Sequence, residues 1–241
     1  MSIKTEIKGG AFWIYIDNAK RRNALTPELY VQLCAAIDES NENEDTILTV
    51  ITGVGDYYSS GNDFSPSANA GIDHSDPDYE AGFSKFMRRL IDHKKVLMAL
   101  VNGPAIGIMC TTLMLFDYRI CSDTAYFFTP FTDLGLCPEG TSSRTFPALM
   151  GSTRATEMLL LNEKMDPQRA KETGFVSHVF PVREFREKAA QLVEKYSKLP
   201  KHSVLASRAL IRSDAWREEM RATNNREYET LRKLFVHEDT I

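Results

Sequence analysis

The chain has 241 residues, of which 43% are hydrophobic, so it can form one domain or a compact core with a helical tail. Its formal net charge of −4 gives no support for general binding to nucleic acid or to a membrane surface. No apolar run approaches the roughly 18 residues of a membrane span. The four cysteines include no Cys-x-x-Cys pair, so neither a zinc site nor a disulfide framework is expected. This pattern predicts an intracellular reducing compartment.

The N-terminal part predicts a strand, a polar loop, a helix and a second strand, in that order. Residues 12–16 form the early strand and residues 17–25 the loop. Thr26, Pro27 and Glu28 are a strong helix start, because a hydroxyl caps the helix, proline suits its first position and an acid suits its first turn. Residues 47–52 are apolar and β-branched, which predicts a buried strand.

A glycine turn follows this second strand. Gly61 would free the backbone to turn and leave the N–H of Asn62 pointing outward, although an ordinary surface turn is the alternative. The composition then changes over residues 65–82 to Ser, Pro, Asn, Gly, Asp and Ala, which predicts a long polar loop. Loops of this length are often lids, and simple disorder is the other interpretation. Residues 83–91 predict an amphipathic helix packed on the core.

A second strand end offers a similar backbone donor. Residues 96–101 are continuously apolar and predict a buried strand, and the sequence Asn102-Gly103-Pro104 is typical of a turn. Gly107 allows a close approach of the backbone, and residues 108–116 are apolar enough for a buried helix. The N–H of Ile108 would then be free at the helix start, where it could hold a developing oxyanion. A strand, turn and helix without chemistry is the alternative.

Glu139 is the only Asp or Glu between Asp133 and Glu157. Pro138 and Gly140 flank it, and residues 141–143 resemble the start of a helix. A lone acid at this place is either a functional carboxylate or a charge at a helix terminus. Burial would raise its pKa and the helix N-terminus would lower it, and the sequence leaves this balance open.

The last third of the chain is predicted to be mainly helical. A short helix opens at Asp166-Pro167 and closes at Gly174, followed by a strand at residues 175–180 and an amphipathic helix over residues 185–196. After Pro200 the chain is predicted to be helical to its end. We expect a core over residues 1–198 and a C-terminal helical region over residues 199–241.

Three motifs in series resemble the crotonase, or enoyl-CoA hydratase/isomerase, family. They are SSGND at 59–63, NGPAIG at 102–107, and the segment from TPF at 129–131 to PEGTSS at 138–143. The similarity runs from about residue 12 to about residue 234 and is closest to the peroxisomal type of Δ3,Δ2-enoyl-CoA isomerase. It implies an α/β fold, a spiral of repeated ββα units with a C-terminal helical trimerisation region. A homotrimer or a dimer of trimers is the expected assembly.

The resemblance also implies an active site for an acyl-CoA substrate. Glu139 is the expected proton shuttle, and the N–H groups of Asn62 and Ile108 are the expected oxyanion hole. Arg21 and Arg22 lie in the loop that contacts the CoA nucleotide in relatives, although solvated charges are the alternative. No metal and no cofactor is expected, because CoA is part of the substrate. The expected substrate-binding residues are Ser60, Gly61, Asn62, Asp63, Phe64, Arg22 and Ala24.

Departures from the family pattern separate the possible activities. Hydratases use two glutamates to position a water, and the matching positions here are Thr111 and Phe131, neither of which can act as a base. The resemblance therefore implies isomerisation of a 3-enoyl-CoA (cis or trans) to a trans-2-enoyl-CoA in unsaturated fatty acid β-oxidation, with Glu139 moving one proton from C2 to C4. The alternative is a catalytically weak CoA-binding or interaction module like the chromodomain Y-like relatives, which carry Asp in place of this Glu.

The compartment is predicted by resemblance alone. A peroxisome is the first expectation and the mitochondrial matrix the second, although no targeting signal is visible and Asp239-Thr240-Ile241 is not a Ser-Lys-Leu type ending. Relatives extend further past the equivalent of Leu234, which raises the expectation of a trimmed C-terminus.

Overall fold

The computed structural model describes residues 1–68, 70, 81–236, 238 and 240, and the elements named below lie among them. Most of the loop predicted as a lid, residues 69 and 71–80, lies outside the described residues. The strands are β1 (Ser2–Lys8), β2 (Ala11–Asp17), β3 (Leu48–Gly53), β4 (Val96–Val101), β5 (Ala105–Ile106), β6 (Tyr118–Ser122), β7 (Phe127–Phe128) and β8 (His178–Phe180). The helices are α1 (Pro27–Glu42), α2 (Gly82–Ile91), α3 (Ile108–Thr111), α4 (Ser142–Leu159), α5 (Pro167–Glu172), α6 (Val182–Ser197), α7 (Lys201–Ile211) and α8 (Asp214–Phe235), with short 3-10 turns at Ala19–Arg21, Thr112–Leu115 and Thr132–Leu134.

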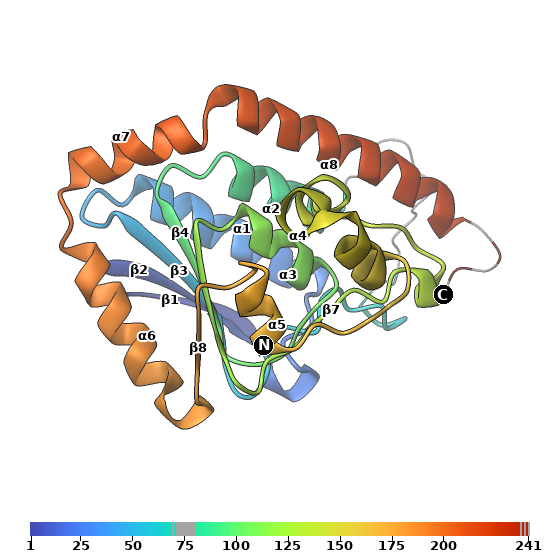
Figure 1. Cartoon of the computed structure of the whole chain (residues 1–241), viewed down its shortest axis with the longest axis horizontal. Coiled ribbons are helices and arrows are strands. Elements are labelled where there is room, and N and C mark those ends of the chain that lie inside the picture. Colours follow the sequence, from blue (N-terminus) through green and yellow to red (C-terminus); the bar gives the residue numbers. More distant parts are fainter. Residues whose placement is uncertain (69, 71–80, 237, 239, 241) are drawn as a thin grey trace.

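A sheet of six strands in the order β1-β2-β3-β4-β6-β8 forms the centre of the molecule (Figure 1). The β1–β2 pair is antiparallel and the other neighbours are parallel. Helices cover both faces, which is why the inner strands β3 and β4 are buried almost without alternation. On β4, Leu97 and Ala99 belong to the core under α1 and α2, whereas Met98 and Leu100 belong to the core under α6.

A spiral of strand-strand-helix repeats builds the part of the chain that follows α1. After β4 the chain forms β5 and then α3, and after β6 it forms β7 and then α4. The strands β5 and β7 pair in parallel in a second, two-stranded sheet. The segment after β3 joins the same layer through a bridge between Ser59 and Ala105. Turns that are far apart in sequence therefore stack at one edge of the molecule, which confirms the crotonase-like α/β class.

Several predicted boundaries are correct and others are wrong. The strand over residues 96–101 is β4, and Thr26 caps α1 by accepting a hydrogen bond from the N–H of Leu29 at 3.3 Å. The helix predicted over residues 108–116 is instead one α-helical turn followed by a 3-10 turn. The strand predicted over residues 175–180 is limited to its last three residues, and the C-terminal helix is interrupted before Ser213, which caps α8.

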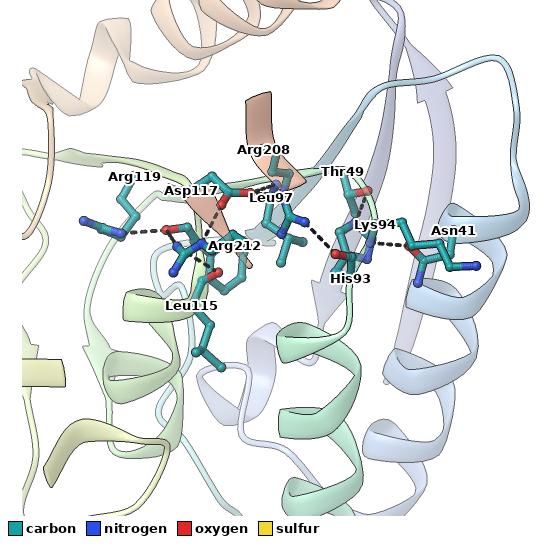
Figure 2. Close-up of polar contacts among 11 residues, drawn as sticks. Asn41, Thr49, His93, Lys94, Leu97, Leu115, Asp117, Arg119, Arg208 and Arg212 are labelled. Atoms are coloured by element: carbon teal, nitrogen blue, oxygen red, sulfur yellow. Dashed lines mark hydrogen bonds and ion pairs between the residues drawn. The ribbon is translucent and has the colours of Figure 1, made fainter. Parts of the chain in front are cut away.

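The last two helices, α7 and α8, run along one side of the molecule (Figure 1), and partly buried ion pairs hold α7 in place. Figure 2 shows Asp117 between Arg208 and Arg212. The Arg208 Nε lies 2.6 Å from one Asp117 carboxylate oxygen and the Arg212 Nε lies 2.9 Å from the other. The same carboxylate accepts the N–H of Leu97 at 2.9 Å, so α7 is tied directly to β4. Within the described part of the chain, no helix is both long and apolar enough to cross a membrane.

Candidate active site

Two glycine turns meet at the edge of the spiral. The N–H of Ile106 donates to the carbonyl oxygen of Ser59 at 3.0 Å, which joins the turn after β3 to the turn after β4. Gly61 has a φ of 85°, and a β-carbon there would lie 2.7 Å from the carbonyl oxygen of Ile106. Only glycine fits this conformation and this approach. The neighbouring residues Asn62 and Ile108 are thereby brought to one side of the molecule.

The main-chain N–H groups of Asn62 and Ile108 are available as donors. Ile108 is the first residue of α3 and follows Gly107, whose φ is 57°. Among the residues that the structure describes, neither N–H has an acceptor. The side chain of Asn62 is held separately, because its Oδ1 accepts the hydroxyl of Tyr30 at 2.5 Å. Sequence reasoning missed Tyr30, which lies on the buried stripe of α1.

Both residues line one cavity, which we call the Glu139 cavity. Its volume is about 100 Å³, and it opens to solvent on one side. Its walls are mostly apolar, with Glu139 as the one carboxylate among the described lining residues. The lining is formed by Ser60, Asn62, Phe64, Ile106, Gly107, Ile108, Pro130, Phe131, Leu134, Leu136, Glu139, Leu231 and Phe235.

Glu139 is 5% exposed, and its Oε2 has no hydrogen-bond partner among the described residues. Its loop is tightly packed, because a β-carbon at Gly140 would lie 2.2 Å from the hydroxyl oxygen of Thr111. Burial, followed by the carboxylate of Glu227, raises the pKa of Glu139 from 4.5 to about 8. A carboxyl with such a pKa can both accept and return a proton near neutral pH.

The balance between burial and the helix N-terminus is therefore settled in favour of burial. The reason is that the start of α4 is already occupied. The carboxylate of Glu227, on α8, accepts the N–H of Thr141 at 2.7 Å and the N–H of Ser143 at 2.9 Å. Sequence reasoning missed Glu227, although its spacing from Met220 and Leu231 places it on the buried stripe of α8.

The expected substrate-binding residues fall into two groups. Ser60, Asn62 and Phe64 line the Glu139 cavity, and Gly61 lies between Ser60 and Asn62, packed against the carbonyl group of Ile106. Asp63 and Ala24 are buried outside the lining.

The two arginines of the preceding loop have different surroundings. Arg21 forms an ion pair with Asp63 at 3.1 Å between its Nη2 and the carboxylate. Arg22 is exposed, and its guanidinium lies 5.4 Å from the centre of the Tyr57 ring. The carbonyl oxygen of Arg22 accepts the N–H of Ser60 at 2.9 Å, so Arg22 lies next to a turn that lines the cavity.

The residues at the two hydratase positions differ in their surroundings. Phe131 lines the Glu139 cavity, whereas Thr111 is buried and donates its hydroxyl to the carbonyl oxygen of Ile108 at 3.1 Å.

The C-terminal helix contributes to the same cavity. Leu231 and Phe235 of α8 form part of its wall, and Met220 is buried in the chain's own core. Part of the apolar surface expected at an interface between subunits is thus used within the chain. Leu210 and Ile211 of α7 remain 83% and 73% exposed.

The family model for enoyl-CoA hydratase/isomerase matches residues 6–240. Enoyl-CoA delta isomerase 2 of Rattus norvegicus is 40% identical over 236 residues, which are 97% of this chain and 60% of that protein. Enoyl-CoA delta isomerase 3, peroxisomal, of Mus musculus is 38% identical over 203 residues, which are 83% of this chain and 63% of that protein. The chain thus spans about 60% of the length of these two relatives. The human chromodomain Y-like protein matches at 30% identity over 220 residues, 90% of this chain and 36% of that protein.

The arrangement of the whole chain is also found in a crystal structure of an enoyl-CoA hydratase/isomerase from Pseudoalteromonas atlantica T6c. The two superpose with a TM-score of 0.91 at 26% sequence identity, covering 99% of this chain and 93% of the other.

Proposed function

The chain belongs to the enoyl-CoA hydratase/isomerase family, and from this premise we propose that it converts 3-enoyl-CoA, cis or trans, to trans-2-enoyl-CoA. One observation carries the proposal. A single buried carboxyl, Glu139, lines the same apolar cavity as two main-chain N–H groups that have no acceptor among the described residues. The names of the rat and mouse relatives, both enoyl-CoA delta isomerases, support the same activity.

In the proposed reaction, ionised Glu139 removes a proton from C2 of the acyl chain. The electron pair moves into a dienolate, whose negative charge lies on the thioester oxygen. The N–H groups of Asn62 and Ile108 hold that oxygen more strongly than the neutral carbonyl, which lowers the barrier. The protonated Glu139 then returns its proton to C4 on the same face, so the double bond moves and the carboxylate is restored. CoA is part of the substrate, and this chemistry uses no further cofactor.

Hydration is the less favoured reaction for this site. It needs a water positioned by acidic groups, and the two positions where hydratases carry them are Thr111 and Phe131. The walls beside Glu139 are mainly apolar, which suits an acyl chain better than an ordered water. We therefore expect hydration of 2-enoyl-CoA to be much slower than isomerisation in the same preparation, and comparable rates would contradict a single-base reaction.

The remaining parts of the proposal extend from the relatives. We propose a place in unsaturated fatty acid β-oxidation, in a peroxisome or, as second choice, in the mitochondrial matrix. We also propose a trimer or a dimer of trimers, for which exposed Leu210 and Ile211 are suitable contact residues. A stable monomer in light scattering at micromolar concentration would contradict this assembly.

The test is an isomerase assay with trans-3-hexenoyl-CoA, followed by the ultraviolet absorbance of the conjugated product. Glu139→Gln keeps the size of the side chain but cannot accept a proton, so turnover should fall by about 10²–10⁴ while ligand binding persists. Glu139→Asp withdraws the carboxylate by about 1 Å and should cost about 10². Glu157→Gln, at the far end of α4, is the control and should be unaffected.

Turnover of Glu139→Gln near the parent rate would make Glu139 a helix-terminal charge. A parent protein that binds acyl-CoA without turnover would instead favour the interaction module, as in the chromodomain Y-like alternative.

A further inference from the structure

Glu227 is a buried acid on a helix whose other face is strongly charged. It is 6% exposed and lies on the stripe of α8 that faces the core. One of its carboxylate oxygens accepts the N–H of Thr141 at 2.7 Å. The other accepts the N–H of Ser143 at 2.9 Å and its hydroxyl at 2.5 Å. Burial raises the pKa of Glu227, whereas these three donors favour its ionised form and act in the opposite direction.

This carboxylate replaces the ordinary cap of α4. Thr141 occupies the N-cap position in the left-handed conformation, with a φ of 64°, and its side chain makes no capping hydrogen bond. A helix start needs acceptors for its first N–H groups, and they are usually supplied by the N-cap side chain itself. Here the acceptor comes from α8, 84 residues away from Ser143. The shape of the short loop that carries Glu139 therefore depends on the docking of α8, which lies beside α4 in Figure 1.

The same carboxylate also determines the electrostatic surroundings of Glu139. An uncapped helix start would favour an ionised acid next to it. Glu227 neutralises that start and adds a like charge, so it acts on Glu139 in the same direction as burial. Among the described residues, Tyr30 from α1 and Cys137 from the loop of Glu139 also interact with Glu139, and the pKa of each is raised, first by burial and then by Glu139.

The position of α8 links this contact to the cavity. Leu231 follows Glu227 by four residues and Phe235 by eight, and both line the Glu139 cavity. One face of α8 thus supplies both a wall of the cavity and the acceptor that holds the Glu139 loop.

We propose that Glu227 is a positioning residue that holds the loop of Glu139 in place by capping α4 from α8. The inference rests on the proposed isomerase function for its kinetic consequences. Its structural and electrostatic content, the coupling between two carboxyl groups, is independent of turnover. Glu227 does not line the cavity, so it acts through Glu139 rather than on the substrate.

The variants are Glu227→Gln, which removes the charge, Glu227→Asp, which keeps it, and Glu219→Gln as a matched control. Glu219 also lies on α8 and also contacts α4, through Arg144 at 2.6 Å, but at an exposed position. Two measurements are made on each variant. One is the pH profile of kcat/KM with trans-3-hexenoyl-CoA, and the other is the titration of ¹³C-labelled glutamate carboxyls by NMR, with Glu139 assigned from Glu139→Gln.

Glu227→Gln should lower the titration midpoint of Glu139 by about 1 pH unit and move the acid limb of kcat/KM by the same amount. The plateau should fall about tenfold or more, because the amide keeps only one acceptor oxygen and the N–H of either Thr141 or Ser143 loses its partner. Glu227→Asp should keep the midpoint near that of the parent, and Glu219→Gln should change neither quantity. Equal midpoints in Glu227→Gln and the parent would overturn the proposal, even if turnover falls at every pH.

Two further outcomes are distinguishable. If the parent shows no isomerase activity but the midpoint moves in Glu227→Gln, the proposed function fails and the coupling stands. If Glu227→Gln does not fold, the parent decides, because the Glu227 resonance should show an inflection near the Glu139 midpoint that disappears in Glu139→Gln. Absence of that inflection in the parent would overturn the proposal.

Discussion

Replacing the Glu139 carboxyl by a neutral amide should change how the stability of the protein depends on pH. Burial and Glu227 raise the pKa of this carboxyl from 4.5 to about 8. A group whose pKa is higher in the folded state stabilises the fold fully below its unfolded pKa and loses that contribution as pH rises through its folded pKa. The loss for Glu139 therefore begins near pH 4.5 and is complete above about pH 8.

The size of the effect follows from the interval between the two values. One pH unit corresponds to about 1.4 kcal/mol, so the interval from 4.5 to about 8 is worth on the order of 5 kcal/mol of unfolding free energy. Relative to its parent, Glu139→Gln should gain about 1 kcal/mol at pH 5, about 3 kcal/mol at pH 7 and about 5 kcal/mol at pH 9. The variant that loses turnover should thus become the more stable protein at alkaline pH, apart from a constant offset for the amide.

Urea unfolding followed by tryptophan fluorescence at pH 5, 7 and 9 measures this difference. All samples need one protein concentration, because association of subunits makes apparent stability depend on concentration. Glu157→Gln serves as the control and should follow the parent at all three values. Parallel stability curves for Glu139→Gln and the parent would refute the reasoning, because they would mean that folding leaves the ionisation of Glu139 unchanged.

Three further substitutions test other parts of the structure. Arg208→Met leaves the partly buried Asp117 with one arginine fewer and should cost about 3 kcal/mol of unfolding free energy in the same urea assay. A cost below about 1 kcal/mol would contradict the role of this ion pair. Gly61→Ala places a β-carbon 2.7 Å from the carbonyl oxygen of Ile106 in the adjacent turn. The clash should displace the oxyanion donors and lower kcat/KM by about 10², and an unchanged kcat/KM would contradict the proposed oxyanion hole. Ile108→Pro removes one main-chain N–H at the first position of α3, where a helix tolerates proline. Turnover in the isomerase assay should fall by about 10²–10³, and full activity would exclude this N–H as an oxyanion donor.

Local sequence was sufficient for much of the fold and for three members of the candidate site. The apolar run over residues 96–101 is short and followed by turn residues, which favours a strand buried on both faces, and it is β4. Gly61 and Gly107 were informative because a positive φ is a local requirement that glycine meets, and both have one. Glu139 was found because it is the only acid in an otherwise uncharged segment.

Helix lengths near the site were less predictable. The apolar composition of residues 108–116 suits a helix, but it does not distinguish a regular helix from one turn followed by a 3-10 turn. Both arrangements bury the same side chains, so the choice depends on the packing of β5 and β7 around this segment. The helical prediction for the region after Pro200 agrees with α7 and α8, but the break between them was not predicted, because the cap at Ser213 looks like any serine in a charged segment.

The amino-acid sequence by itself thus determined which residues could act: two glycine turns with a free N–H, and one acid beside a helix start. Only the tertiary structure decided how strong that acid is. Its pKa depends on burial and on Glu227, which is 88 positions further along the chain and reaches α4 only when α8 docks. The physical reason is that hydrogen bonding and charge act through space over a few ångströms, and a linear sequence does not specify which of its distant residues will share that space.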